Sequence, residues 1–242
     1  MTTQQLPTVS AVAGMIDHAI LKPELTRAEV DAALDDAAAN HVFSVCVRPS
    51  DITHAVERLA GTGVLVGTVI GFPHGTTSTA TKAAESRQAI ADGAAELDMV
   101  VNIGWLRSGL TDEVEADVRG VVDAAGDTIV KVILETAYLD DDQIVAGSKA
   151  AERGGAAFVK TSTGFAGGGA TLPHLRLMRE AVSDSVQVKA SGGVRGLDTV
   201  LEMLDLGVTR FGTSASGTIL ADLAHRLETG SASGAGDDTT SY

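Results

Sequence analysis

Three of the six lysines in this 242-residue chain fall inside short apolar runs of the kind that form β-strands. Lys131 lies in IVKVILE, Lys160 in AFVKTS and Lys189 in VQVKAS. Lysine is depleted in strands and is almost never fully buried without a partner. These placements therefore predict a cluster of amines with carboxylates beside it.

Alternation along each strand predicts which side chains share the lysines' side. Around Asp98, the apolar Leu97 and Met99 occupy one face and must meet the covering helices, so Asp98 points the other way. The same rule turns a set of polar residues inward: Asp17, Ser44, Cys46, Arg48, Glu96, Lys131, Glu135, Lys160, Gln187, Lys189 and Ser191. The sequence thus predicts an interior that holds amines and carboxylates together.

Such a cluster suits imine chemistry. A lysine that is desolvated or lies near another cation has a lowered pKa, and its neutral amine can attack a carbonyl. The iminium that results withdraws electrons, so an adjacent C–C bond can break or form through an enamine. A second lysine can keep the first neutral and move protons, and a carboxylate such as Asp98 can act as general acid or base.

Other common catalytic patterns do not occur. The six histidines (His18, His41, His54, His74, His174 and His225) form neither His-x-His nor His-Glu-x-x-His spacing, which argues against a metal-dependent aldolase or hydrolase. No Gly-x-Ser-x-Gly elbow is present, so a serine hydrolase is unsupported.

Glycine-rich segments follow the last three strand candidates. Thr163-Gly164 and Gly167–Gly169 come after Lys160, Gly192-Gly193 after Lys189, and the segment 212–217 (GTSASG) after VTRF. Backbone N–H groups exposed by glycine can bind an anion without basic side chains, and loops after the seventh and eighth strands form the usual phosphate site of a barrel. The predicted substrate is a small phosphorylated aldehyde or sugar.

The apolar runs that carry these residues predict eight strand–helix units. Strand candidates begin near Gly14, Val42, Val64, Ala95, Ile129, Ala157, Val186 and Val208, about 22 to 34 residues apart. Helix ends between them are marked by capping boxes at Thr26 and Asp140 and by expected left-handed caps at Gly93, Gly126, Gly154 and Gly207. We predict an α/β fold, a single-domain (β/α)8 TIM barrel over residues 1–229, with a flexible tail at 230–242. The main rival is an open doubly wound sheet, but no Gly-x-Gly-x-x-Gly follows the first strand.

Composition narrows the class of partner. The chain has 44% apolar and 21% charged residues, an ordinary globular balance, and its net charge of −14 opposes binding to nucleic acid or to anionic membranes. The single cysteine, Cys46, allows no internal disulfide, and neither a membrane-spanning run nor a signal peptide is recognisable. We therefore expect a cytoplasmic protein.

At this point the sequence resembles the deoxyribose-phosphate aldolase family of class I aldolases. The resemblance covers about residues 13 to 220 and lies in eight blocks that occur in order: IDHAILKP, VCVRP, TVIGFPHG, ELDMVVNIG, VKVILET, FVKTSTGF, VKASGGVR and RFGTSAS. It implies reversible cleavage of 2-deoxy-D-ribose 5-phosphate into D-glyceraldehyde 3-phosphate and acetaldehyde, without metal or organic cofactor. It also implies a homodimer, since barrels of this family often pair.

The resemblance assigns roles residue by residue. Lys160 is the expected Schiff-base lysine, Lys189 the second lysine that exchanges protons, and Asp98 the carboxylate of the proton relay. Lys131 is expected to support these groups rather than react. The expected substrate-binding residues are Asp17, Cys46, Thr163, Gly164, Gly192, Gly193, Gly212 and Ser214. Some members end in a mobile Ser-Tyr that aids proton transfer, which makes Tyr242 a candidate relay residue.

Departures from the family pattern leave alternatives open. Ala19 stands where many members have threonine, Phe165 where some have a phosphate-binding lysine, and Ala215 where some have serine. The alternatives are another Schiff-base barrel, such as a transaldolase-like enzyme, a non-catalytic sugar-phosphate binding protein, and a metal-dependent barrel lyase.

Overall fold

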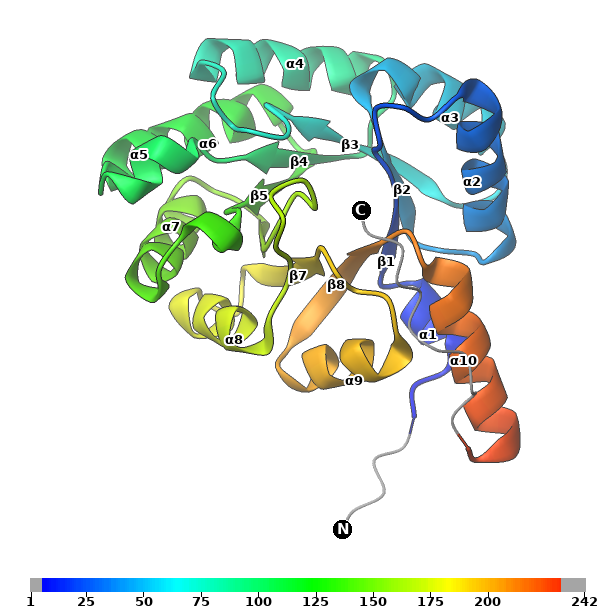
Figure 1. Cartoon of the computed structure of the whole chain (residues 1–242). Helices are drawn as coiled ribbons and strands as arrows, with labels where there is room; N and C mark the ends of the chain where they lie inside the picture. Colours follow the sequence, from blue (N-terminus) through cyan, green and yellow to red (C-terminus); the bar gives the residue numbers. More distant parts are fainter. Residues whose placement is uncertain (1–5, 232–242) are drawn as a thin grey trace.

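The computed structural model describes residues 6–231, which form a ring of strands surrounded by helices (Figure 1). The strands are β1 (Ile16–Ile20), β2 (Ser44–Val47), β3 (Leu65–Ile70), β4 (Glu96–Val100), β5 (Ile129–Ile133), β6 (Phe158–Lys160), β7 (Gln187–Ser191) and β8 (Val208–Thr213). The helices are α1 (Val9–Ala13), α2 (Arg27–Ala39), α3 (Ile52–Arg58), α4 (Thr79–Ala91), α5 (Ile103–Arg107), α6 (Thr111–Ala125), α7 (Asp141–Arg153), α8 (Leu172–Ala181), α9 (Leu197–Asp205) and α10 (Ser216–Thr229). Two short 3-10 helices, η1 (Pro49–Asp51) and η2 (Thr136–Tyr138), follow β2 and β5.

The eight strands are parallel and close into a barrel in sequence order, with β8 paired back to β1. This confirms the predicted (β/α)8 barrel and excludes the open doubly wound sheet. The register places residues of predicted function side by side: Asp98 pairs with Lys131 between β4 and β5, and Lys160 with Lys189 between β6 and β7.

The apolar face of each strand packs under the helices. Leu97 and Met99 on β4 and Val132 on β5 are completely buried in the main hydrophobic core, on the side of the sheet opposite to Asp98 and Lys131. Fully buried parallel strands of this kind need apolar side chains on their outer face, because helices cover it. The sequence alternation therefore predicted the orientation of these strands correctly.

The two predicted capping boxes begin α2 and α7. The Thr26 side chain accepts from the N–H of Glu29, and Asp140 accepts from that of Gln143, while each partner side chain reaches back to the cap. The left-handed cap predicted at Gly154 is wrong, since its φ is −70° and the positive φ falls on Gly155. Gly154 lacks a side chain for another reason: a Cβ there would lie 2.6 Å from Val118 on α6.

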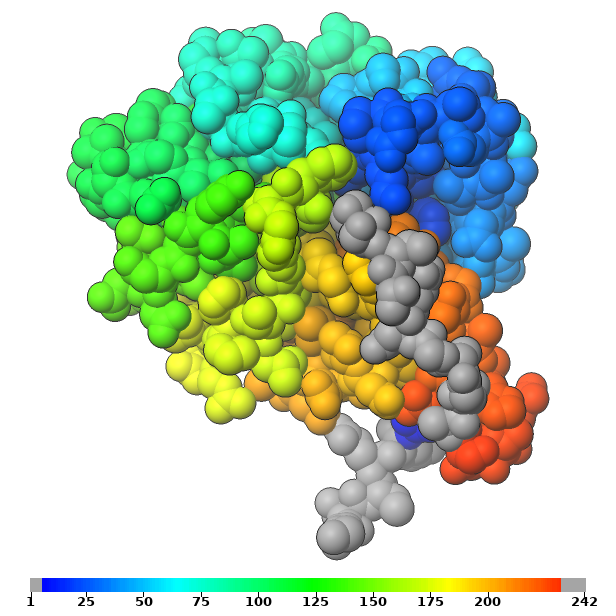
Figure 2. All heavy atoms as spheres, in the orientation of Figure 1, coloured from blue at the N-terminus to red at the C-terminus, as the bar shows by residue number. Residues whose placement is uncertain are grey.

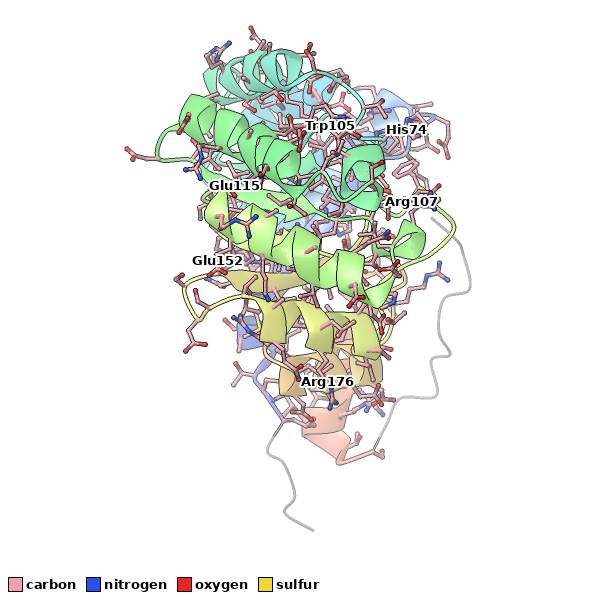
Figure 3. All side chains as sticks on the ribbon, turned by 90° about the vertical axis from the view of Figure 1, so that its left-hand side faces the viewer. His74, Trp105, Arg107, Glu115, Glu152 and Arg176 are labelled. Atoms are coloured by element: carbon pink, nitrogen blue, oxygen red, sulfur yellow. The ribbon has the colours of Figure 1, made fainter. Side chains whose placement is uncertain are left out.

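Charged side chains link the helices on the outside of the barrel (Figure 3). Glu115 on α6, labelled in this view, forms ion pairs with Arg119 on its own helix and with Arg153 on α7, at 2.8 and 2.6 Å. These exposed pairs contribute little individually. A buried pair lies behind them, where Lys82 on α4 meets Asp117 on α6 at 2.5 Å.

The described chain reaches two residues past α10, where Gly230 adopts the left-handed conformation. The predicted flexible tail at 230–242 lies almost wholly outside the described residues, so this domain boundary stays a prediction. Within residues 6–231, none of the helices combines the length and the apolar character needed to cross a bilayer.

Candidate active site

Three lysines converge on one carboxylate inside the barrel. Lys160 and Lys189 both donate to Asp98 Oδ2, at 2.8 and 2.7 Å, and Lys131 donates to Asp98 Oδ1 at 2.8 Å. All four side chains are buried. Lys160 is the last residue of β6, which places its amine toward the C-terminal mouth of the barrel, where such folds carry their chemistry.

Asp17 on β1 is a second shared carboxylate. Its Oδ2 accepts from Lys189 and lies 3.6 Å from Lys131, while its Oδ1 accepts from Arg210 and from Ser44, at 2.8 and 2.7 Å. Asp17 is therefore fully engaged with protein groups. The predicted substrate contact of Asp17 stays a prediction, and the structure adds that it holds Lys189.

Arg210 and Glu96 lie deeper in the lumen. Glu96 Oε2 accepts from Lys131 at 2.7 Å and from Arg210 at 3.2 Å, whereas its buried Oε1 has no hydrogen-bond partner among residues 6–231. The Arg210 guanidinium sits 3.7 Å from the centroid of the Phe43 ring and 5.4 Å from that of Phe158. Stacking on aromatic rings and pairing with carboxylates both suit an arginine, which stays charged in this setting.

The pKa of Lys160 is lowered, unlike that of the other two lysines. Burial is the main cause, and the positive charge of Lys189 adds to it, while Asp98 opposes both. Burial also disfavours the charge on Lys189, but Asp17 and Asp98 outweigh it and raise its pKa. Burial likewise disfavours the charges of Asp98 and Lys131, but the opposite charges around each group outweigh it. The pKa of Asp98 is therefore lowered and that of Lys131 is raised. Lys160 is thus the amine best placed to be neutral.

Cys46 on β2 is buried beside this cluster. Burial and the charge of Asp98 raise the pKa of its thiol to about 11, so the thiol stays protonated. It belongs to a small apolar group with Leu21 and Val69. The predicted substrate contact of Cys46 stays a prediction.

Thr163 is fixed by Glu135, which follows β5. The carboxylate of Glu135 accepts from both the N–H and the hydroxyl of Thr163, and the Thr163 hydroxyl in turn accepts from the N–H of Phe165 at 3.0 Å. Glu135 has a φ of +59°, which is rare for a residue with a side chain. Burial raises the pKa of its carboxyl, against the opposing hydrogen bonds from Thr163. This arrangement sets the path of the chain into Gly164.

A glycine-walled pocket of about 270 Å³ opens next to this segment. Its described lining is Gly164, Gly167, Gly168, Gly169, Gly192, Gly193 and Arg195. Both Gly192 and Gly193 have a positive φ, and a Cβ on Gly169 would lie 2.3 Å from the carbonyl oxygen of Gly192. The loops after β6 and β7 therefore meet at a spacing that only glycine permits. The anion site expected at these glycines stays a prediction. Gly212 and Ser214 lie outside this lining, so their phosphate contacts stay predictions.

A second pocket, of about 320 Å³, is mainly apolar and has Phe165 in its lining. The lining comes from the segments after β1, β2, β3 and β6, together with one residue of β3 and one of α4: Leu21, Pro23, Arg48, Pro49, Val69, Gly71, Phe72, Pro73, Glu85 and Phe165. Phe72 and Phe165 meet edge to face with centroids 5.3 Å apart. In Figure 2 the yellow-green segment after β6 lies across the face toward the viewer, close to the cyan segment after β3.

Sequence reasoning missed some residues of this site and misplaced one. Arg210 and Arg195 lie within matched blocks but had no role, although two-residue alternation from the apolar Phe211, which packs in the outer core, would have turned Arg210 inward. Arg48, expected inside, lies past the end of β2 and pairs with Asp51 at 2.6 Å, because the strand ends at Val47. Tyr242 lies outside the described residues, and its role stays a prediction.

Comparison with known proteins identifies consistent relatives. A model of the DeoC/LacD aldolase family matches residues 11–234. Deoxyribose-phosphate aldolase 2 of Staphylococcus aureus (strain MRSA252) is 53% identical over 211 residues, 87% of this chain and 96% of that protein. The deoxyribose-phosphate aldolase of Staphylococcus haemolyticus is 51% identical, with the same coverage of each chain. The solved tetrameric deoxyribose phosphate aldolase of Aeropyrum pernix has a TM-score of 0.83 at 27% identity, covering 93% of this chain and 94% of that one.

Proposed function

The chain belongs to the DeoC/LacD family of aldolases, lyases that act through a Schiff base, and from this we propose the roles of its residues. The substrate is 2-deoxy-D-ribose 5-phosphate, cleaved reversibly to D-glyceraldehyde 3-phosphate and acetaldehyde. Lys160 forms the imine, Lys189 and Asp98 move the protons, and Lys131 holds Asp98. The single observation that carries this proposal is the contact of Lys160 and Lys189 with one oxygen of Asp98.

The reaction follows from this geometry. The neutral amine of Lys160 adds to the C1 aldehyde of the open-chain sugar, and loss of water leaves an iminium. A base takes the proton of the C3 hydroxyl, the C2–C3 bond breaks, and its electron pair forms the enamine while glyceraldehyde 3-phosphate leaves. Protonation of the enamine carbon and hydrolysis then release acetaldehyde and restore the amine. Asp98 Oδ2 and the Lys189 ammonium are the nearest groups for these transfers.

The glycine-walled pocket is the proposed phosphate site. Its N–H groups suit an anion in a protein of net charge −14, and Arg195 supplies a guanidinium at its wall. Some family members carry a lysine where this chain has Phe165, which here faces the apolar pocket. Arg195 therefore takes over the cationic part of phosphate binding in this proposal.

Reductive trapping tests the assignment of Lys160. Treatment with acetaldehyde and borohydride, followed by peptide mass mapping, should give an adduct on Lys160 and none in the Lys160→Ala variant. Lys149→Ala, at an exposed position on α7, serves as the matched control and should trap normally. An adduct on another residue, or no adduct, contradicts the assignment.

The alternatives are separated by simple assays. A transaldolase-like enzyme would prefer dihydroxyacetone over acetaldehyde as donor, and a sugar-phosphate binding protein would release no glyceraldehyde 3-phosphate in a coupled assay. Activity that survives EDTA would exclude the metal-dependent lyase.

The proton-relay role of Tyr242 predicts that Tyr242→Phe lowers turnover while imine trapping persists.

Assembly and location complete the proposal. A homodimer is proposed by resemblance, while the Aeropyrum pernix relative is described as a tetramer. Light scattering distinguishes twice the 24.7 kDa chain mass from four times that mass. The cytoplasmic location stays a prediction, which fractionation of the native cells would test.

A further inference from the structure

Seven ionisable groups of the described lumen form one connected network. The basic members are Lys131, Lys160, Lys189 and Arg210, and the acidic members are Asp17, Glu96 and Asp98. If all were ionised, four positive charges would face three negative ones. A buried excess of charge is costly, and loss of one proton from a lysine removes it.

The contacts indicate which lysine gives up its proton. Lys131 lies within 4 Å of three carboxylates and Lys189 contacts two. Among the carboxylates of the described chain, Lys160 contacts only Asp98, through an oxygen that it shares with Lys189. Arginine retains its charge in proteins. The positive charge of Lys160 is therefore the least compensated, so Lys160 is the lysine that loses its proton.

We propose that Arg210 and Glu96, which form no ion pair with Lys160, set the net charge of the lumen and thereby the protonation of Lys160: Arg210 favours the neutral amine, and Glu96 opposes it. Both are positioning residues. Arg210 adds the fourth positive charge and uses Asp17 and Glu96 as partners, so these carboxylates compensate the lysines less. The ring of Phe43, just before β2, and the ring of Phe158, the first residue of β6, hold the guanidinium in place. This proposal rests on the assignment of Lys160 as the imine-forming lysine.

The other groups facing Lys160 do not alter the count. Asp98 from β4 and Lys189 from β7 are already members of the network. The Cys46 thiol from β2 is neutral, since its pKa is raised to about 11. Lys160 is the last of the influences on the pKa of Glu135, which follows β5 and accepts its hydrogen bonds from Thr163. The charge of the lumen therefore depends on the seven network residues.

Substitutions at the two positions should shift imine formation in opposite directions. Arg210→Met keeps an apolar stem between the rings but removes one positive charge, which leaves three cations for three anions and favours the protonated form of Lys160. Glu96→Gln removes one negative charge and favours the neutral form. Arg210→Met combined with Glu96→Gln restores the original excess of one positive charge. Each single change should shift the midpoint by about one pH unit.

The test is the rate of borohydride trapping by acetaldehyde as a function of pH, with the adduct mapped to Lys160. We expect the midpoint to rise in Arg210→Met, to fall in Glu96→Gln, and to return near the wild-type value in the double variant. Arg210→Lys, which keeps the charge, should keep the midpoint. The Arg210→Met rate should recover to the wild-type plateau at high pH.

Two failures can be told apart. If trapping in the wild-type protein occurs at another residue, the proposed function fails. If trapping occurs at Lys160 but Arg210→Met lowers the plateau without moving the midpoint, the role of Arg210 is only structural and the charge proposal is overturned. A double variant whose midpoint does not return toward the wild-type value overturns it as well, even if either single variant folds poorly.

Discussion

Between α4 and α6, Lys82 forms an ion pair with Asp117 that is buried as deeply as the lysines of the lumen. Its ammonium also donates to the carbonyl of Val100 at 2.9 Å, and the second oxygen of Asp117 accepts from Thr79 at 2.8 Å. One positive charge meets one negative charge, and each has neutral hydrogen-bond partners. The two charges of this pair therefore balance each other.

The lumen differs in both respects. Its described network holds one more basic than acidic group, and within the described chain Glu96 Oε1 is buried without a partner, while Asp98 Oδ2 accepts from two lysines. Burial alone therefore does not make a lysine reactive in this molecule. Incomplete compensation of charge therefore distinguishes the lysines of the lumen, which form the reactive cluster, from the structural pair of Lys82 and Asp117.

Removal of the least compensated lysine should have the largest effect. Lys160→Ala eliminates the amine that forms the imine, so turnover of 2-deoxy-D-ribose 5-phosphate should fall by at least about 10⁴-fold. A coupled assay for glyceraldehyde 3-phosphate measures this loss, and Lys149→Ala should retain full activity. Appreciable turnover by folded Lys160→Ala would place the chemistry on another residue.

Removal of its neighbour should have the next largest effect. Lys189→Leu deprives Asp17 and Asp98 of a shared cation and takes away the group that opposes protonation of Lys160. Turnover should fall by about 10³-fold, within the range of a lost acid or base. Steady-state kinetics measures the effect, and near-normal kcat in this variant would refute the coupling of the two lysines.

The structural pair should respond in stability rather than in chemistry. Lys82→Met leaves Asp117 buried without its cation, so the free energy of unfolding should fall by about 3 to 5 kcal/mol. Denaturant titration measures the loss, and kcat of the folded fraction should change little. Adding Asp117→Leu removes the stranded charge and should restore much of the stability; no recovery would mean that the pair is not the source of the loss.

Glu135 is a further buried carboxylate, and it accepts its hydrogen bonds from the neutral Thr163. Its pKa is raised above 4.5, chiefly by burial. The native protein therefore binds a proton that the unfolded chain has lost, so stability should decline as pH rises from about 4.5 through the raised pKa. Glu135→Gln should flatten this slope, because the amide cannot take up the proton. Unfolding curves at several pH values would measure it, and an unchanged slope would show that Glu135 does not titrate there.

Sequence alternation predicted which face the main polar strand residues occupy, but not their depth or their partners. It turned Asp98, Lys131, Lys160 and Lys189 inward because a strand has a period of two, and the structure brings these four together. It could not distribute three lysines among three carboxylates, since that depends on the closed register of the barrel. The burial of Lys82 could not be predicted either, because a lysine on a helix has the pattern of a solvent-facing residue. Its partner Asp117 comes from α6, and the two meet only in the folded chain.

The proposed anion pocket has a consequence for how this protein could evolve. Six of its seven described lining residues are glycine, so its shape is made by the main chain. Mutation alters side chains, and at Gly169 any side chain would strike the neighbouring loop. Natural variants could thus abolish this pocket but hardly retune it. New substrate preferences would have to arise across the barrel mouth, where Leu21, Val69 and Phe72 offer replaceable side chains.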